Sequence, residues 1–388
     1  MRSLRHGLLI SLAVLMVPAL QPPGHSAWSD PAGSKYFVYV GTYTGPNSKG
    51  IYAYRFDATA GKLDSIGLVG EMVRPSFLAL HPNGRFLYAV SELGNDGRVN
   101  GSITAFAIDH KSGTLTALNT VSSGGGGACH LVVDKTGENL LVANYGSGSA
   151  ACFRLTQTGR IGERTALMQH AGSGVDPQRQ LGPHAHAVVL SLDNRFLLVP
   201  DLGLDKIFVY RFDAGHGTLS ANDPPFAAVP PGSGPRHLAF HPSGRFAYVL
   251  NEMKSSVTAF AFGRETGALR DPRTVSNLPD DFSGVDNSAE IETDAVGRFL
   301  YASNRGHDSI TIYAINPASG ALTMVDRVPT QGKIPRNFEI DPTGRYLFAA
   351  NQESDSIVVF SRDAETGRLK ALTEVHVSAP VCIRFLPD

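Results

Sequence analysis

The chain has 388 residues, of which 42% are hydrophobic and 18% are charged, a composition that favours a packed core and excludes a disordered protein. Lys and Arg total 34 against 35 Asp and Glu, so the net charge of -1 excludes the basic surface that nucleic-acid binding needs. The 41 glycines and 24 prolines predict many turns and exclude a long helical bundle.

The N-terminal segment has the features of a targeting signal. Arg2 and Arg5 precede an apolar run over residues 7–20, and the sequence QPPGHSA follows it. This pattern predicts a signal peptide over residues 1–26, and therefore export to the periplasm or secretion. The apolar run is shorter than the roughly 20 residues of a transmembrane helix. We expect no contact with the membrane after cleavage; a retained N-terminal anchor is the alternative.

The cysteines do not form a disulfide pattern. Cys129, Cys152 and Cys382 are few and odd in number, and we expect free, buried thiols even in an exported protein. The sequence contains no Walker loop, HExxH motif or GxSxG nucleophile elbow. We therefore expect no cofactor and no resident metal.

A hairpin pattern recurs from residue 75 onwards: an apolar strand, a tight turn with Gly-Arg-aromatic, and a second apolar strand. Examples are PSFLALHPNGRFLYAVSE at 75–92 and PRHLAFHPSGRFAYVLNE at 235–252, and further copies begin at residues 128, 185, 288 and 335. Alternating or wholly apolar runs around such turns predict β-hairpins. Between them lies a second unit, a β-rich strand followed by Gly-x-apolar, which occurs seven times.

The seventh hairpin is split between the two ends of the chain. PVCIRFLPD at 380–388 matches its first strand, and SKYFVYVGT at 34–42 matches its second. The pattern predicts an all-β fold, a seven-bladed β-propeller with four antiparallel strands per blade. Pairing of the N- and C-terminal strands would close the ring and leave no open sheet edge. Residues 34–388 are thus expected to form a single propeller domain.

The hairpin geometry predicts where polar side chains converge. The start of the first strand and the end of the second lie at the same end of each blade, and first strands line the channel of a propeller. Residues at these positions from all seven blades should therefore face one mouth of the channel. They include His130, His186, Arg236, His237, Glu290, Arg336 and Asn337 on first strands, and Glu252 and Arg305 after second strands.

Structural roles are the alternative for several of these residues. The recurring Asn144, Asn251, Asn304 and Asn351 are expected to satisfy groups at strand ends. His130 and His237 are equally compatible with a packed core. A guanidinium near the channel, in contrast, needs an anion, which a neighbouring Glu or a bound ligand would supply.

Three segments carry a resemblance to a known family: residues 183–213, 234–252 (GPRHLAFHPSGRFAYVLNE) and 300–310 (LYASNRGHDSI). They resemble the bacterial 6-phosphogluconolactonase of the seven-bladed type, in a lactonase family that includes the fungal carboxy-muconate lactonizing enzyme. The resemblance covers nearly all of residues 36–388. It implies a metal-independent lactone hydrolase, or a cycloisomerase with related ring chemistry.

The resemblance also implies site residues. The His, two Arg and Glu of the muconate enzyme fall on His186, Arg236, Arg336 and Glu252, which become the candidate catalytic residues. The candidate substrate-binding residues are His130, His184, His237, Glu290, Arg305 and Asn337.

The predicted reaction is hydrolysis of a sugar lactone to the open-chain acid. The arginines would offset the charge that develops on the carbonyl oxygen, and His186 or Glu252 would take a proton from water. A phosphogluconolactone is cytosolic whereas export is predicted, so the substrate stays open between that compound and another aldonolactone. We expect a monomer whose partner is a sugar lactone or sugar acid.

Two alternatives remain at this point. One is an exported, non-catalytic propeller that binds a small ligand or a partner protein, because a fold does not determine a function. The other is a calcium site, for which the candidate ligands are Glu92, Asn144, Asp201 and Glu290.

Overall fold

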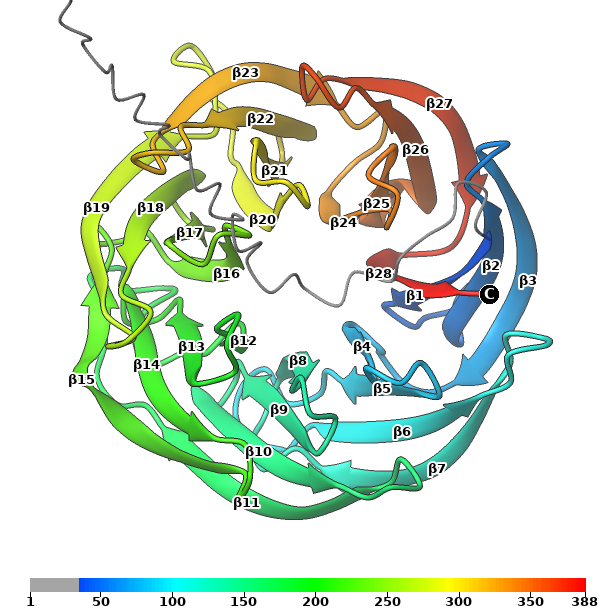
Figure 1. Ribbon diagram of the computed structural model, residues 1–388, viewed down its shortest axis with the longest axis horizontal. Coiled ribbons are helices and arrows are strands. Elements are labelled where there is room, and N and C mark those ends of the chain that lie inside the picture. Colours follow the sequence, from blue (N-terminus) through cyan, green and yellow to red (C-terminus); the bar gives the residue numbers. More distant parts are fainter. Residues whose placement is uncertain (1–34) are drawn as a thin grey trace, which may run out of the picture.

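Seven four-stranded antiparallel sheets surround a central axis in the computed structural model, which describes residues 35–388 (Figure 1). The predicted seven-bladed propeller is therefore confirmed. The predicted signal peptide, residues 1–26, lies outside the described residues. Within residues 35–388, no helix has the length and apolar character that a membrane crossing requires.

The strands of each blade are given in order from the channel outwards. The closing blade contains β28 (Pro380–Pro387), β1 (Lys35–Thr42), β2 (Gly50–Asp57) and β3 (Lys62–Glu71). The next contains β4 (Leu78–Leu80), β5 (Phe86–Ser91), β6 (Ser102–Ile108) and β7 (Leu115–Ser122). The third contains β8 (Ala128–Val133), β9 (Asn139–Asn144), β10 (Ser149–Leu155) and β11 (Ile161–Gln169). The fourth contains β12 (Val189–Leu190), β13 (Phe196–Asp201), β14 (Lys206–Asp213) and β15 (Thr218–Ala228).

The remaining three blades have the same order. The fifth contains β16 (Pro235–Phe240), β17 (Phe246–Asn251), β18 (Ser256–Phe262) and β19 (Leu269–Ser276). The sixth contains β20 (Asn287–Thr293), β21 (Phe299–Arg305), β22 (Ser309–Ile315) and β23 (Leu322–Pro329). The seventh contains β24 (Pro335–Ile340), β25 (Tyr346–Asn351), β26 (Ser356–Arg362) and β27 (Leu369–His376), with the short 3-10 helix η1 (Gln352–Ser354) before β26.

The ring closes as the split hairpin predicts. β28 pairs antiparallel with β1, with Val38 opposite Phe385, and the two strands lie side by side on the inner side of the closing blade (Figure 1). The backbone N–H of Asp388 also donates to the carbonyl of Lys35 at 2.9 Å. Because this pairing uses the edge hydrogen-bonding groups of both β1 and β28, the ring has no open junction between its first and last strands.

The two repeated units pack against each other between neighbouring blades. The hydroxyl of Tyr88, in the Gly-Arg-aromatic hairpin, donates to the carbonyl of Gly159 in the next blade, and Tyr248 does the same to Gly320. Both glycines have a positive φ, and a Cβ at Gly159 would lie 2.3 Å from the ring of Phe86. The recurrent glycine is required because both the turn and the neighbouring aromatic ring exclude a side chain.

Candidate active site

Five of the predicted residues meet at one end of the channel. Arg236 and Arg336 are the second residues of β16 and β24, Glu252 directly follows β17, and Arg305 ends β21. His186 precedes β12 and donates its backbone N–H to Pro200. Pro235 pairs with Asn251, so the start of the inner strand does lie beside the end of the second strand, as the hairpin geometry predicts.

A pocket of about 280 Å³ lies at this end. Five arginines and only two glutamates line it, so we call it the arginine pocket. Its lining residues are Tyr43, Arg74, Glu92, Asn95, Cys129, Tyr145, Arg179, His186, Arg236, Glu252, Arg305 and Arg336.

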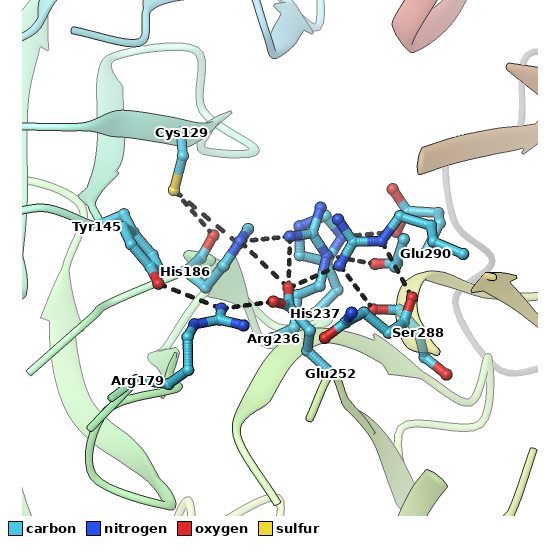
Figure 2. Close-up of polar contacts among 12 residues, drawn as sticks. Cys129, Tyr145, Arg179, His186, Arg236, His237, Glu252, Ser288 and Glu290 are labelled. Carbon is cyan, nitrogen blue, oxygen red and sulfur yellow. Dashed lines mark hydrogen bonds and ion pairs between the residues drawn. The ribbon is translucent and has the colours of Figure 1, made fainter. Parts of the chain in front are cut away.

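Glu252 is the centre of the polar contacts (Figure 2). Its Oε2 lies 3.1 Å from Nη1 of Arg236 and 2.9 Å from Nη2 of Arg305, and its Oε1 lies 2.7 Å from Nη2 of Arg179. Burial opposes ionisation, but Arg305 and Arg236 outweigh it and hold the pKa of Glu252 well below its usual range. Glu252 is thus a buried carboxylate that positions three guanidinium groups, and it is a weak base.

His186 presents an unprotonated nitrogen to this cluster. Its Nε2 contacts Nη1 of Arg236 and lies 4.0 Å from Oε2 of Glu252. A guanidinium can only donate a hydrogen bond, so Nε2 is the acceptor and the ring proton sits on Nδ1. Burial, followed by the charge of Arg236, holds the pKa of His186 well below its usual range. The imidazole is therefore neutral at pH 7.

Arg336 and Arg74 provide cationic surface that the protein itself leaves open. Both guanidinium groups lie over the ring of Tyr43, at 5.1 Å and 4.7 Å from its centroid. Within residues 35–388, neither side chain forms an ion pair, and Nε of Arg74 is buried without a hydrogen-bond partner. The cation–π contacts use the faces of the two guanidinium groups and leave their N–H groups free. An anionic ligand would accept hydrogen bonds from these N–H groups.

Several residues of the arginine pocket were not among the predicted site residues. Arg179 comes from the segment between β11 and β12, outside both repeated units, and Tyr43 and Arg74 lie in the connections that flank β2 and β3. No periodic signal marks these positions. An unusually long connection between two strands was the available clue for Arg179, since loops often supply site residues.

The remaining predicted residues lie elsewhere. His130, His237 and Glu290 line a second pocket of about 460 Å³, closer to the hairpin turns, which we call the glutamate pocket. It is lined by His130, His237, Glu290, Glu292, Glu339 and Arg384 together with apolar side chains of the inner strands. Asn337 lies beside it and donates to Glu290 Oε2 at 2.6 Å. His184 stacks on Tyr145 at 4.4 Å and does not line the arginine pocket.

The expectation of one shared mouth was therefore wrong for His130, His237 and Glu290. A strand advances by about 3.3 Å per residue, so residues further along an inner strand lie deeper in the channel than those at its start. Arg236 lines the arginine pocket and His237 lines the glutamate pocket. The inner strands thus serve two pockets, the arginine pocket at their starts and the glutamate pocket further along them.

The recurring asparagines have the structural role expected of them. Asn251 donates to Ser256 and Thr258, and Asn304 donates to Ser309 and Thr311, in both cases across to the neighbouring strand. Asn351 donates to the carbonyl of Thr330. They stabilise the ends of the blades next to the channel.

The candidate calcium ligands do not converge. Asn144 donates to Ser149, Asp201 pairs with His170 at 2.5 Å, Glu92 lines the arginine pocket and Glu290 the glutamate pocket. In the part of the chain that the structure describes, no three His, Cys, Asp or Glu side chains are placed to hold a metal ion. The three cysteines are free and buried, as expected.

A comparison with protein families shows to which family this chain belongs. The family model described as lactonase, 7-bladed beta-propeller, matches residues 37–385. The chain belongs to this lactonase family.

Several proteins that are named as lactonases are similar to this chain over almost their whole length. A 6-phosphogluconolactonase of Bacillus subtilis is 38% identical over 354 residues, which are 91% of this chain and 99% of that protein. The structure of a periplasmic gluconolactonase of Pseudomonas aeruginosa has a TM-score of 0.85 and 38% identity, and covers 91% of this chain and 99% of that one. A putative 6-phosphogluconolactonase of Bacteroides fragilis has a TM-score of 0.85 and 36% identity, with 92% and 99% covered. These comparisons support lactone hydrolysis in general as the chemistry of this chain.

Proposed function

We propose that this protein hydrolyses a sugar lactone in the arginine pocket and releases the open-chain sugar acid. The observation that carries the proposal is the contact of neutral His186 with the Arg236–Glu252 ion pair, beside two arginines that have no carboxylate partner within residues 35–388. The names of the relatives favour the same chemistry.

The proposed reaction begins with the substrate held by its hydroxyl groups and any anionic group. Arg336 and Arg74 would bind a carboxylate or phosphate, because their N–H groups are directed at no protein carboxylate among the described residues. The pocket volume of about 280 Å³ matches a single small sugar derivative. The phosphorylated lactone and other aldonolactones both fit this description.

His186 is the better candidate for the general base. As water attacks the lactone carbonyl carbon, Arg236 Nη1 transfers its hydrogen bond from His186 Nε2 to the developing oxyanion, and the freed Nε2 takes the proton of the water. The bond to the ring oxygen then breaks, and that oxygen receives the proton back from the imidazolium. A positioned base contributes typically ~10² to 10⁴-fold and a preorganised oxyanion donor ~10² to 10³-fold. Glu252, held ionised by three arginines, would orient Arg236 instead of accepting the proton.

We further propose that the protein is exported. The basis is the signal-like sequence of residues 1–26, together with a similar protein that is described as periplasmic. Export would favour a lactone present outside the cytosol.

The test is hydrolysis of a panel that includes 6-phosphogluconolactone, gluconolactone and galactonolactone, measured as acid release above the spontaneous rate. We expect Arg236→Ala and Glu252→Gln to lower the rate by at least ~10²-fold. Arg264→Ala, at an exposed turn, should leave it unchanged and serves as the matched control. If the wild type does not exceed the buffer rate with any lactone, the enzyme proposal fails and the non-catalytic binding protein becomes the leading candidate.

A further inference from the structure

The glutamate pocket is the larger of the two pockets that share the inner strands, at about 460 Å³ against about 280 Å³. Its wall is mostly apolar, formed by residues such as Phe77, Val132 and Phe338. This size and this mixture of an apolar wall with a few polar groups are typical of small-molecule sites.

Two carboxyl oxygens in this pocket have no hydrogen-bond partner among residues 35–388. Glu292 accepts at Oε2 from the backbone N–H of Ile340 at 3.0 Å, and Glu339 accepts at Oε2 from Arg384. Among the described residues, Oε1 of neither side chain takes part in a hydrogen bond. Neither oxygen is among the buried atoms without a partner, and the Glu339 side chain is 25% exposed, so both oxygens are accessible to a donor group of a ligand.

A histidine provides a second, independent indication of a ligand. His237 is 4% exposed and lines the glutamate pocket, with Nδ1 2.8 Å from Oε1 of Glu290. Its Nε2 is buried and has no partner in residues 35–388. If Nδ1 holds the ring proton for Glu290, Nε2 is an acceptor, so this group also requires a donor.

We propose that the glutamate pocket binds a small organic cation, a primary amine with an apolar body. The ammonium group would donate to the free oxygens of Glu292 and Glu339, and the apolar body would pack on Phe77 and Phe338. This site is separate from the arginine pocket, and the proposal does not depend on the lactonase activity.

The charges around the pocket favour a cation over an anion. The acidic groups that face it are Glu290, Glu292 and Glu339, and the basic ones are Arg384 and Lys135, with His130 and His237 beside them. Arg384 is already paired with Glu339, and Nζ of Lys135 donates to the carbonyl of Leu192. The arginine pocket has the opposite balance, so an anionic sugar acid would prefer the arginine pocket.

The acid–base state of the carboxyls is consistent with a site for a cation. Burial, followed by the charge of Glu339, raises the pKa of Glu292 well above its usual range. Burial, followed by the charge of Glu290, raises the pKa of Glu339 to about 7, although Arg384 opposes this shift. A bound ammonium group would replace the proton that a carboxyl of raised pKa otherwise retains.

The experiment is isothermal titration calorimetry of the purified protein with 2-phenylethylamine. The uncharged 2-phenylethanol and the anionic 3-phenylpropionate serve as probes of similar size. We expect the amine to bind at least ~10-fold more tightly than the alcohol, and the acid not to bind this pocket. Titration in two buffers of different ionisation enthalpy should show release of up to about one proton per amine at pH 7, because a carboxyl ionises on binding.

Variants locate the site. Glu292→Gln should weaken amine binding by at least ~10-fold, whereas Glu374→Gln, an exposed carboxylate on β27, should not change it. If Glu292→Gln does not fold, as judged by its circular dichroism, the wild type provides the second test: amine affinity should rise from about pH 5 to about pH 8. Equal binding of amine and alcohol, amine binding that Glu292→Gln leaves intact, or no amine binding at ~10 mM would each overturn the proposal.

Discussion

Nη2 of Arg179 lies 2.7 Å from Oε1 of Glu252. Arg179 belongs to the connection between β11 of the third blade and β12 of the fourth, whereas Glu252 follows β17 of the fifth blade. The same arginine lies 3.5 Å from the hydroxyl of Tyr145. A segment outside the repeated units thus completes the charge cluster that the repeats build, and its side chain remains 41% exposed at the mouth of the arginine pocket.

Replacement of Arg179 tests the contribution of this segment. Arg179→Ala should lower kcat/KM for the lactone that the wild type hydrolyses by about 10-fold, because Glu252 keeps two of its three guanidinium partners while the mouth loses one cation. The melting temperature should stay within a few degrees, since the side chain is partly exposed. A loss of activity that is matched by unfolding would contradict a role at the pocket. Arg264→Ala is the control.

Arg336 is predicted to select for anionic substrates. Arg336→Gln should lower kcat/KM for 6-phosphogluconolactone by at least ~10-fold and for gluconolactone by much less, because the guanidinium forms no ion pair within residues 35–388. Steady-state kinetics with both lactones, side by side, measures the ratio. An equal loss for both substrates would show that Arg336 does not recognise an anionic group.

The pH dependence follows from the lowered pKa of His186. Burial and Arg236 lower that pKa well below 6.5, so the imidazole stays unprotonated as the pH falls through the range in which a free histidine takes up a proton. We expect kcat/KM, corrected for spontaneous hydrolysis, to be level from about pH 8 to about pH 6 and to fall only in more acidic buffer. A titration with its midpoint near 6.5 would rule out a base in this environment. His186→Asn should lower the rate by ~10² to 10⁴-fold.

The closing blade is held to its neighbour by aromatic packing. The ring of Phe56 on β2 lies 4.9 Å from that of Phe348 on β25 and 6.1 Å from that of Phe385 on β28. Phe56→Ala should lower the free energy of unfolding by about 3–5 kcal/mol, measured by urea denaturation. Leu372→Ala, at a side chain that is half exposed, should change it by less than about 0.5 kcal/mol. Similar effects of the two variants would argue against a packed junction there.

The buried thiols should be inert in the folded protein. Burial raises the pKa of Cys152 and that of Cys382 to about 11, and it also raises the pKa of Cys129. Because the thiolate is the reactive form, iodoacetamide should label all three only after unfolding in urea. Intact-mass spectrometry counts the added groups. Labelling of Cys129 in the native state would instead show that the arginine pocket opens far enough to admit the reagent.

The sequence predicted the whole fold but only part of the candidate site. The blades were predictable because each is a local hairpin whose alternation and turn residues recur, and the split copy at residues 34–42 and 380–388 required ring closure. The meeting of Arg236, Glu252 and His186 followed from the same register. Arg179 was missed because nothing in its local sequence indicates where its connection folds.

The linear pattern by itself determined the number of blades, the strand pairing and the end of the blade at which charged residues gather, since all of these depend on short-range periodicity and turn chemistry. The tertiary structure alone decided which of those residues share a pocket. Arg236 and His237 are adjacent in sequence but line different pockets, which follow one another along the channel, and burial among neighbouring charges decides which groups are ionised. Such effects arise between blades that are distant in sequence, so they exist only once the ring has closed.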